Sequence, residues 1–185
     1  MKSVLMSIHP KWCELIASGK KTVEVRKTKP KLETPFKCYI YCTIGKDSLA
    51  SVNGKVNKPN EIIIDLTKNS TIYELNGKVI GEFVCDKIKE ITADNLVAIY
   101  FNNPQENTCL NDLEMRQYAD GKNLFLWHIS NLIIYDKPKE LSEFLIDCKN
   151  CGKKFVGDMD CWKGCINGYR RITKPPQSWC YIEGE

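Results

Sequence analysis

The order of the β-prone segments is the feature that most constrains the fold of this chain. Apolar residues alternate or cluster as they do in strands, but without the regular strand–helix repeat of a parallel α/β protein. Strands are predicted at residues 2–8, 22–29, 38–45, 77–91 and 124–136, with a last strand near the C-terminus. Short helices separate some of them. The sequence therefore predicts an α+β fold, a small and mainly antiparallel β-barrel with flanking short helices.

The helices are predicted from the signals at their ends. Pro10 fits the first turn of a helix over residues 10–18, and Gly19 follows it as a C-terminal cap. Pro138 fits the first turn of a second helix that would start in "KPKELSEFL". Gly81 interrupts a predicted strand, and a glycine inside a strand often marks a bend or a close backbone approach.

Length and composition indicate one globular domain over residues 1–185. Hydrophobic residues make up 43% of the chain and charged residues 27%. Within the domain we expect a polar insertion at 46–76, with a short strand at 61–66, and a four-cysteine loop at 146–168. No apolar run approaches the ~20 residues that cross a bilayer, and the N-terminus resembles a first strand rather than a signal peptide. A cytoplasmic protein without a membrane partner is expected, and no obligate protein partner is indicated.

The stretch "SGKKTVEVRK" at residues 18–27 places an acid next to bases on a predicted strand. Alternation directs Val23 and Val25 to one face and Glu24 and Arg26 to the other. Two interpretations are open. The polar face is either a solvated edge of the sheet or a functional cluster, with Lys20 and Lys21 at the entrance of the strand.

This stretch resembles the signature of the ASCH domain, a member of the PUA-like superfamily. The signature G-x-K-x-x-E-x-R matches at Gly19, Lys21, Glu24 and Arg26. The lead-in "VLMSIHPKWCELIASGKKTVEVR", the segments "GKVIGEFVCDKI" and "YADGKNLFLWHISNLIIYDKPKEL", and the ending "PPQSWCYIE" are also similar to the family. The resemblance implies a small β-barrel with a cleft beside the motif. It also implies a ligand that is RNA or a modified base, because some members remove an acyl group from modified cytidine and others are ribonucleases.

The residue types of the motif suit such a ligand. Lys21 and Arg26 can hold a phosphate or polarise a carbonyl, and Glu24 can accept from a base or act as a general base. The deacylase members, however, carry a threonine nucleophile where this chain has Glu24, so their mechanism does not carry over. Glu114 is a candidate second carboxylate or part of a solvated helix face. We expect a nucleic-acid or modified-nucleobase binding module, with a hydrolase using Lys21 and Glu24 as the alternative.

Basic charge is uneven along the chain, which favours an anionic partner. Residues 1–44 hold nine Lys and Arg against three Asp and Glu, and residues 148–174 hold seven against two. RNA or single-stranded nucleic acid is the commonest such partner. Segregation in sequence need not form a patch in space, so the alternative is that the charge is dispersed over the surface.

Four cysteines are spaced as ligands of one zinc ion. "CKNC" and "CWKGC" are a C-x2-C and a C-x3-C pair separated by nine residues, and four thiolates form a closed tetrahedral zinc site. The predicted ligands are Cys148, Cys151, Cys161 and Cys165. Reactive pairs, a partial disulfide and an iron–sulfur cluster are the alternatives, and a zinc-stabilised protein-binding adaptor is a weaker alternative for the function.

Cations and rings around these cysteines suggest a further contact with nucleic acid. Lys163, Arg170 and Arg171 would contact phosphates, while Trp162 stacks on a base or covers the metal. The six other cysteines are expected to be small core residues. They are Cys13, Cys38, Cys42, Cys85, Cys109 and Cys180.

Overall fold

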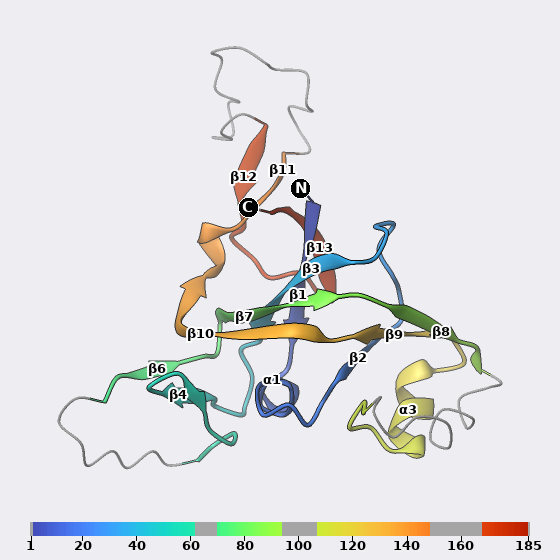
Figure 1. The fold of residues 1–185 in the computed structure, drawn as a ribbon, viewed down its shortest axis with the longest axis horizontal. Coiled ribbons are helices and arrows are strands. Elements are labelled where there is room, and N and C mark those ends of the chain that lie inside the picture. Colours follow the sequence, from blue (N-terminus) through green and yellow to red (C-terminus); the bar gives the residue numbers. More distant parts are fainter. Residues whose placement is uncertain (1, 62–69, 94–106, 149–167, 185) are drawn as a thin grey trace.

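The computed structural model describes residues 2–61, 70–93, 107–148 and 168–184. Their strands form three sheets (Figure 1). The largest has seven strands in the order β10-β7-β3-β1-β13-β11-β12, and two smaller sheets have the orders β2-β9-β8 and β5-β4-β6. All strand pairs are antiparallel except β1 with β3. The α+β, mainly antiparallel architecture is therefore confirmed.

The elements follow the predicted order with shifted ends. The helices are α1 (Pro10–Ala17), α3 (Asp112–Ala119) and the 3-10 turn η2 (Leu141–Glu143). The strands are β1 (Lys2–Ile8), β2 (Val23–Arg26), β3 (Phe36–Cys42), β4 (Ala50–Val52), β5 (Lys55–Val56), β6 (Ile72–Glu74), β7 (Lys78–Cys85), β8 (Ile88–Ile91), β9 (Leu124–His128), β10 (Ser130–Glu140), β11 (Leu145–Asp147), β12 (Tyr169–Arg171) and β13 (Trp179–Glu183).

A closed barrel is not confirmed, because the hydrogen-bonded strand orders of the described sheets are open. The predicted helix at "KPKELSEFL" is wrong. Pro138 lies inside β10, an edge strand, where a residue without an N–H leaves no ladder bond unmade. Within this segment only Leu141–Glu143 are helical, as the 3-10 turn η2. The described part of the 46–76 insertion forms the small sheet β5-β4-β6, and most of the short strand expected at 61–66 lies outside the described residues.

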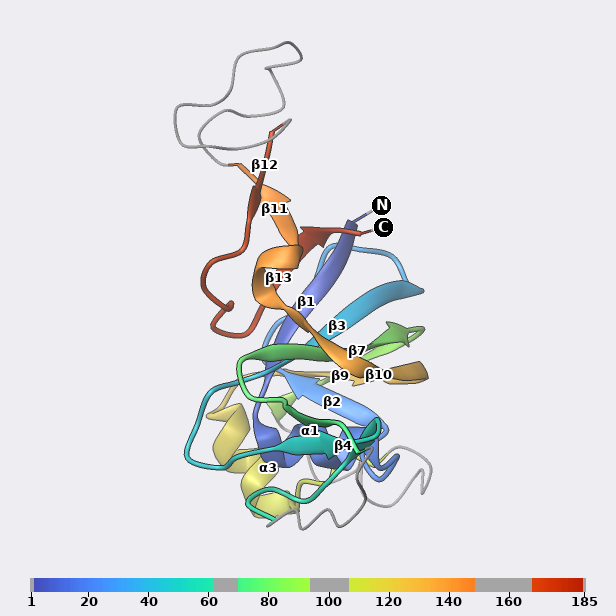
Figure 2. The same cartoon turned by 90° about the vertical axis from the view of Figure 1, so that its left-hand side faces the viewer.

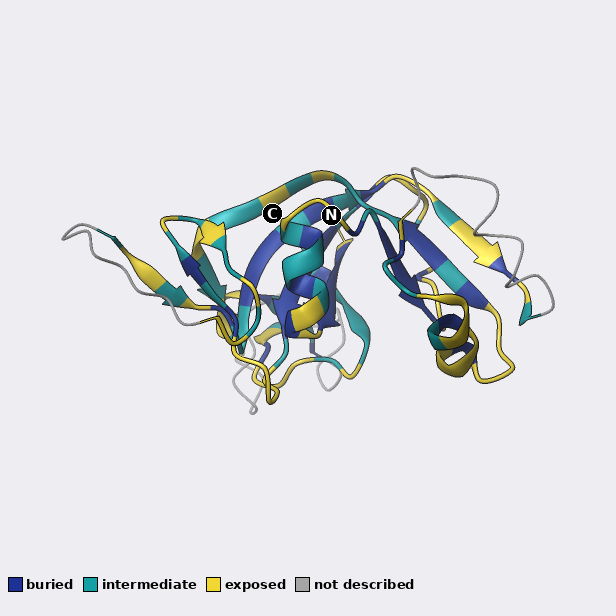
Figure 3. Ribbon diagram, turned by 90° about the horizontal axis from the view of Figure 1, so that it is seen from below, coloured by how far each residue is buried: buried dark blue, intermediate teal, exposed yellow. Residues whose placement is uncertain are grey.

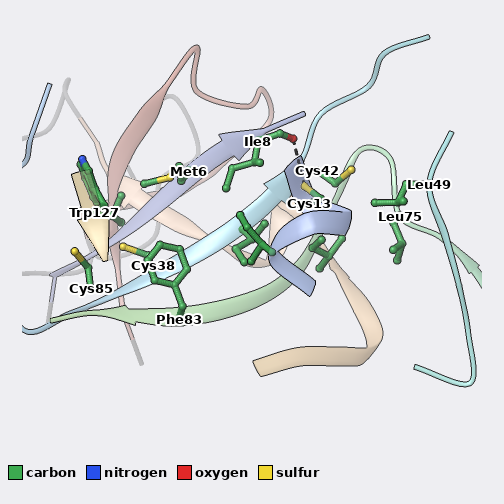
Figure 4. Packing of buried hydrophobic residues seen from close by; sticks show 14 of the residues in the cluster. Met6, Ile8, Cys13, Cys38, Cys42, Leu49, Leu75, Phe83, Cys85 and Trp127 are labelled. Carbon is green, nitrogen blue, oxygen red and sulfur yellow. Dashed lines mark hydrogen bonds between the residues drawn. The ribbon is translucent and has the colours of Figure 1, made fainter. Parts of the chain in front are cut away.

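Both faces of the large sheet are covered by apolar side chains. Cys38, Ile40 and Phe83 pack on one face with α1 and Trp127, as Figure 4 shows for most of this cluster. Tyr39 and Tyr41 pack on the other face against residues that follow β10. Four of the six scattered cysteines are fully buried in the first cluster, as predicted, whereas Cys109 and Cys180 are half-buried.

Gly81 lies where two strands approach each other closely, as predicted for a glycine inside a strand. A Cβ at Gly81 would lie 2.4 Å from the carbonyl oxygen of Ile133, so only glycine allows β10 to approach β7 this closely. The single strand predicted over 77–91 is divided into β7 and β8, which belong to different sheets. The described residues hold no helix long and apolar enough to span a bilayer.

Candidate binding cleft

The G-x-K-x-x-E-x-R motif lies at the junction of α1 and β2. Gly19 has φ +73°, which allows the chain to turn sharply after α1. The N–H of Lys21 then donates to the carbonyl of Leu15 in α1 at 2.8 Å, which places Lys21 beside the helix just before β2 begins. The conformation of the glycine thus fixes where the lysine enters the site.

The polar residues of the motif are buried. The exposed fractions are 3% for Lys21, 6% for Glu24 and 7% for Arg26. The solvated-edge interpretation of β2 is therefore wrong. The reason is tertiary, since β2 lies beside the end of β1 and the segment before β13, as the contacts of Arg26 show.

Glu24 lies between two cations. Its Oε2 is 3.4 Å from Lys21 Nζ, and its Oε1 is 3.0 Å from Arg26 Nε, although that N–H is not directed along a hydrogen bond. Lys21 Nζ donates to the Thr108 carbonyl at 2.6 Å. Arg26 Nη2 donates to the Ser7 carbonyl at 2.7 Å. Each buried charge therefore has partners, as burial in a protein requires.

This cluster forms part of the wall of a cleft of about 640 Å³. The cleft is built from residues of α1, β2, α3 and the segment that precedes β13. Its lining includes Trp12, Lys21, Glu24, Arg26, Tyr118 and Ser178. Ser178 adds to the cluster, because Arg26 Nη1 lies 3.4 Å from its Oγ. A smaller hollow of about 430 Å³ between α1, the β4–β5 turn and β10 has no comparable cluster of buried charges among its lining residues.

Two aromatic rings line the cleft, and each has a lysine over it. Lys21 Nζ is 5.1 Å from the centroid of the Trp12 ring, and Lys27 Nζ is 5.3 Å from that of Tyr118. Burial raises the pKa of the Tyr118 hydroxyl. Neither ring was predicted as a site residue. The helical spacing of Trp12 indicates a core residue, and no sequence signal connects Tyr118 with β2.

The other predicted site residues are divided between the two ends of the molecule. Lys20 is exposed next to the cleft but does not line it. Arg170 and Arg171 lie on β12, at the opposite end from α1 in both Figure 1 and Figure 2. Lys163 lies outside the described residues. The structure thus does not bring β12 to the cleft.

Of the predicted zinc ligands, Cys148 is described and the other three are not. It is buried and follows β11 directly, and its N–H donates to the Gly168 carbonyl at 2.7 Å. Cys151, Cys161 and Cys165 lie outside the described residues. Within the described ranges no group of three or more metal-ligating side chains comes together.

Glu114 caps α3 and is not a second carboxylate of the cleft. Its side chain accepts the N–H of Asn111, while the Asn111 side chain accepts the N–H of Glu114. This capping box is a structural role at the beginning of the helix. It also accounts for the acidic residue in the first turn of α3, where a negative charge is favourable.

Comparisons with known proteins agree with the fold. A family model described as the ASCH domain matches residues 6–93, which include the motif, the end of β1, α1 and β2 to β8. No curated protein matches the sequence.

The chain is also similar to crystal structures of an ASCH protein from Zymomonas mobilis. A tyrosine-to-phenylalanine variant of that protein superposes with a TM-score of 0.56 and 17% identity over 99% of this chain and 91% of that chain. The ASCH structure recorded without a substitution gives 0.55 and 18% over 98% and 87%. This chain therefore has the fold of the ASCH proteins, and the match to the family's sequence covers residues 6–93.

Proposed function

We propose that the cleft binds nucleic acid, with a preference for RNA, or a modified nucleobase. One observation carries the proposal: Lys21, Glu24 and Arg26 are buried together in the wall of an open cleft. Burial of charges costs several kcal/mol per ion, and apolar packing stabilises a fold at least as well. A buried ion cluster beside an open cleft therefore suits recognition better than folding.

The resemblance to the ASCH domain supports the same ligand class. The match covers the G-x-K-x-x-E-x-R motif, and the PUA-like superfamily, to which we assign this chain, generally handles RNA or modified bases. Charge supports it further, because Lys27 is exposed at the cleft and residues 1–44 carry excess basic charge. A closed small β-barrel remains part of this proposal.

A hydrolase that uses Lys21 and Glu24 is the second candidate, and the geometry favours it less. Both oxygens of Glu24 are engaged by cations, and Lys21 Nζ donates to a backbone carbonyl. A general base needs a lone pair directed at the proton that it removes. A carboxylate held from both sides suits an anchored acceptor better than a proton shuttle.

Binding is tested by fluorescence anisotropy with short single-stranded RNA, single-stranded DNA and duplex probes over a salt series. Affinity should fall as salt rises, because phosphate contacts release counterions. Lys27→Gln should reduce the slope of log K against log salt by about 0.7, the value for one contact with a single strand. Lys137→Gln, on the exposed part of β10 away from the cleft, is the control.

Absence of binding to every probe at low salt would contradict a nucleic-acid ligand. It would leave a free modified nucleoside as the ligand, or the weaker candidate, a zinc-stabilised adaptor for a protein. The hydrolase is tested with the same preparation, by measuring turnover of RNA and of acylated cytidine.

We also propose that Cys148, Cys151, Cys161 and Cys165 bind one zinc ion. The described ends of the loop fit this ligand set. Strands β11 and β12 pair in register, and the bond from the Cys148 N–H to the Gly168 carbonyl closes the base of the loop. The buried position of Cys148 also suits a ligand of a closed structural site.

Elemental analysis of protein purified without added metal should then give about one zinc per chain. Cys151→Ser and Cys161→Ser should each lower the zinc content sharply, whereas Cys109→Ser, outside the cluster, should leave it unchanged. A metal-free preparation whose four thiols react freely under native conditions would exclude the site.

A further inference from the structure

The two buried cations in the cleft wall, Lys21 and Arg26, are already engaged by groups of the protein. Lys21 Nζ donates to the carbonyl of Thr108 and lies beside Glu24. Arg26 Nη2 donates to the carbonyl of Ser7. A bare phosphate would have to compete with these partners, and with the Glu24 carboxylate, for either cation. The wall is therefore better suited to a ligand group with little charge of its own.

Apolar area in the cleft is supplied by two rings from different helices. Trp12 comes from α1 and Tyr118 from α3, and Figure 3 shows both helices on the face toward the viewer, with exposed residues on α3. Tyr118 is 38% exposed, and burial raises the pKa of its hydroxyl, while the charge of Arg26 lowers this pKa and that of Glu24 raises it by smaller amounts. Part of Tyr118 is thus open to a ligand in the cleft, with Lys27 Nζ 5.3 Å from the centroid of its ring.

The edge of β2 that faces away from β9 contributes to the cleft at Val25. The N–H of Ile129 donates to the carbonyl of Thr22 on the β9 side, and the N–H of Val23 donates to the carbonyl of Asn107 on the other side. Backbone groups alternate along an antiparallel strand, so those of Val25 point the same way as those of Val23. Val25 lines the cleft, and among the described residues no strand pairs with this edge.

These three features together match one chemical class. We propose that the cleft holds a planar heterocycle, the base of a single strand or a nucleoside, with Trp12 and Tyr118 on its ring and the Val25 backbone at its polar edge. The inference rests on the proposed function and makes it specific, since it assigns recognition to the rings and the strand edge. The buried ions then hold β2 in position for this contact.

The test compares two probes that differ only in their bases. One is a single-stranded RNA of about eight nucleotides, within the usual range of site sizes, and the other has the same length and phosphates but abasic positions throughout. Stacking of a base on an aromatic side chain corresponds to roughly 5- to 150-fold in affinity. The wild-type protein should bind the abasic probe weaker by about this factor.

Variants of Tyr118 separate the ring from its hydroxyl. Tyr118→Leu should lose a similar factor for the RNA but not for the abasic probe, and Tyr118→Phe should keep most of the affinity. Trp12→Phe should likewise be tolerated better than Trp12→Leu. Leu113→Ala changes an exposed residue of the same helix and is the control for α3.

Equal affinity for both probes, with no effect of Tyr118→Leu, would overturn the assignment to the rings while nucleic-acid binding stands. If neither probe nor a free nucleoside binds at low salt, the proposed function fails and this inference fails with it. Circular dichroism of each variant checks that a loss of affinity is not a loss of fold.

Discussion

Two ion pairs at opposite ends of the molecule have almost the same length and very different surroundings. Glu24 Oε1 and Arg26 Nε are 3.0 Å apart in the cleft wall, where their side chains are 8% and 9% exposed. Lys2 Nζ and Asp147 Oδ2 are 3.1 Å apart between β1 and β11, where their side chains are 41% and 43% exposed. Because the two distances are almost the same, the main differences between the pairs are burial and the second cation, Lys21, beside Glu24.

Burial affects more than the attraction between the two charges. It also determines how much stability is lost when one of the two charges is removed. In the exposed pair, water solvates whichever charge remains, and such pairs contribute about 0.2–1 kcal/mol. In the buried cluster, Lys21 and Arg26 would lose their counter-ion in a site that water reaches poorly. The cost is then mainly that of an uncompensated buried charge.

The largest expected effect follows from removing the acid from each pair. Glu24→Ala should lower the free energy of unfolding by about 3–5 kcal/mol, the cost of breaking a buried ion pair. Asp147→Ala should lower it by about 0.2–1 kcal/mol. Urea unfolding followed by circular dichroism measures both values.

Similar losses for the two variants would show that the cleft wall is as well solvated as the surface, and the contrast between the two ends would disappear. Glu24→Gln sharpens the measurement, because it keeps the volume of the side chain while removing its charge. If Glu24→Gln unfolds as easily as Glu24→Ala, charge rather than packing explains the loss.

The sequence predicted the elements of the fold better than their assembly. The lead-in from Lys2 to Arg26 was predictable because its alternation, Pro10 and Gly19 all act locally. The helix at "KPKELSEFL" was wrong, since pairing with β7 extends β10 through Pro138 to Glu140. Such an override depends on a partner strand that is distant in sequence, and no local signal reports it.

The same limit applies to the candidate site. Lys21, Glu24 and Arg26 were predicted from the motif, but their burial was not. It depends on hydrogen bonds from the two cations to the Thr108 and Ser7 carbonyls, which are distant in sequence. Alternation also placed Glu24 and Arg26 on one face, as observed in their ion pair. Tyr118 was not predicted for the same reason as the pairing of β10 with β7. In both cases the contact joins residues that are distant in sequence.

Charge segregation in the sequence places described basic residues at both ends of the molecule. The basic N-terminal region supplies the cleft, and Arg170 and Arg171 are exposed on β12 at the other end (Figures 1 and 2). The two ends are therefore separate candidates for contact with an anionic partner. The effects on binding of a substitution in the cleft and of a substitution on β12 should therefore be independent of each other.

The smallest expected effect belongs to the exposed pair, and it depends on pH. The hydrogen bond and the charge of Asp147 raise the pKa of Lys2 above its usual 10.5. A raised lysine pKa means that the pair's contribution is complete below pH 10.5 and is lost as the pH rises through the folded-state value.

A double-mutant cycle with Lys2→Met and Asp147→Asn isolates the pair from the contact of Lys2 with the Tyr181 ring. The coupling energy should be about 0.2–1 kcal/mol at neutral pH and smaller in high salt, because exposed charges are screened. It should approach zero once Lys2 is deprotonated. A coupling energy of several kcal/mol, unchanged by salt, would mean that this pair behaves like the buried cluster despite its exposure.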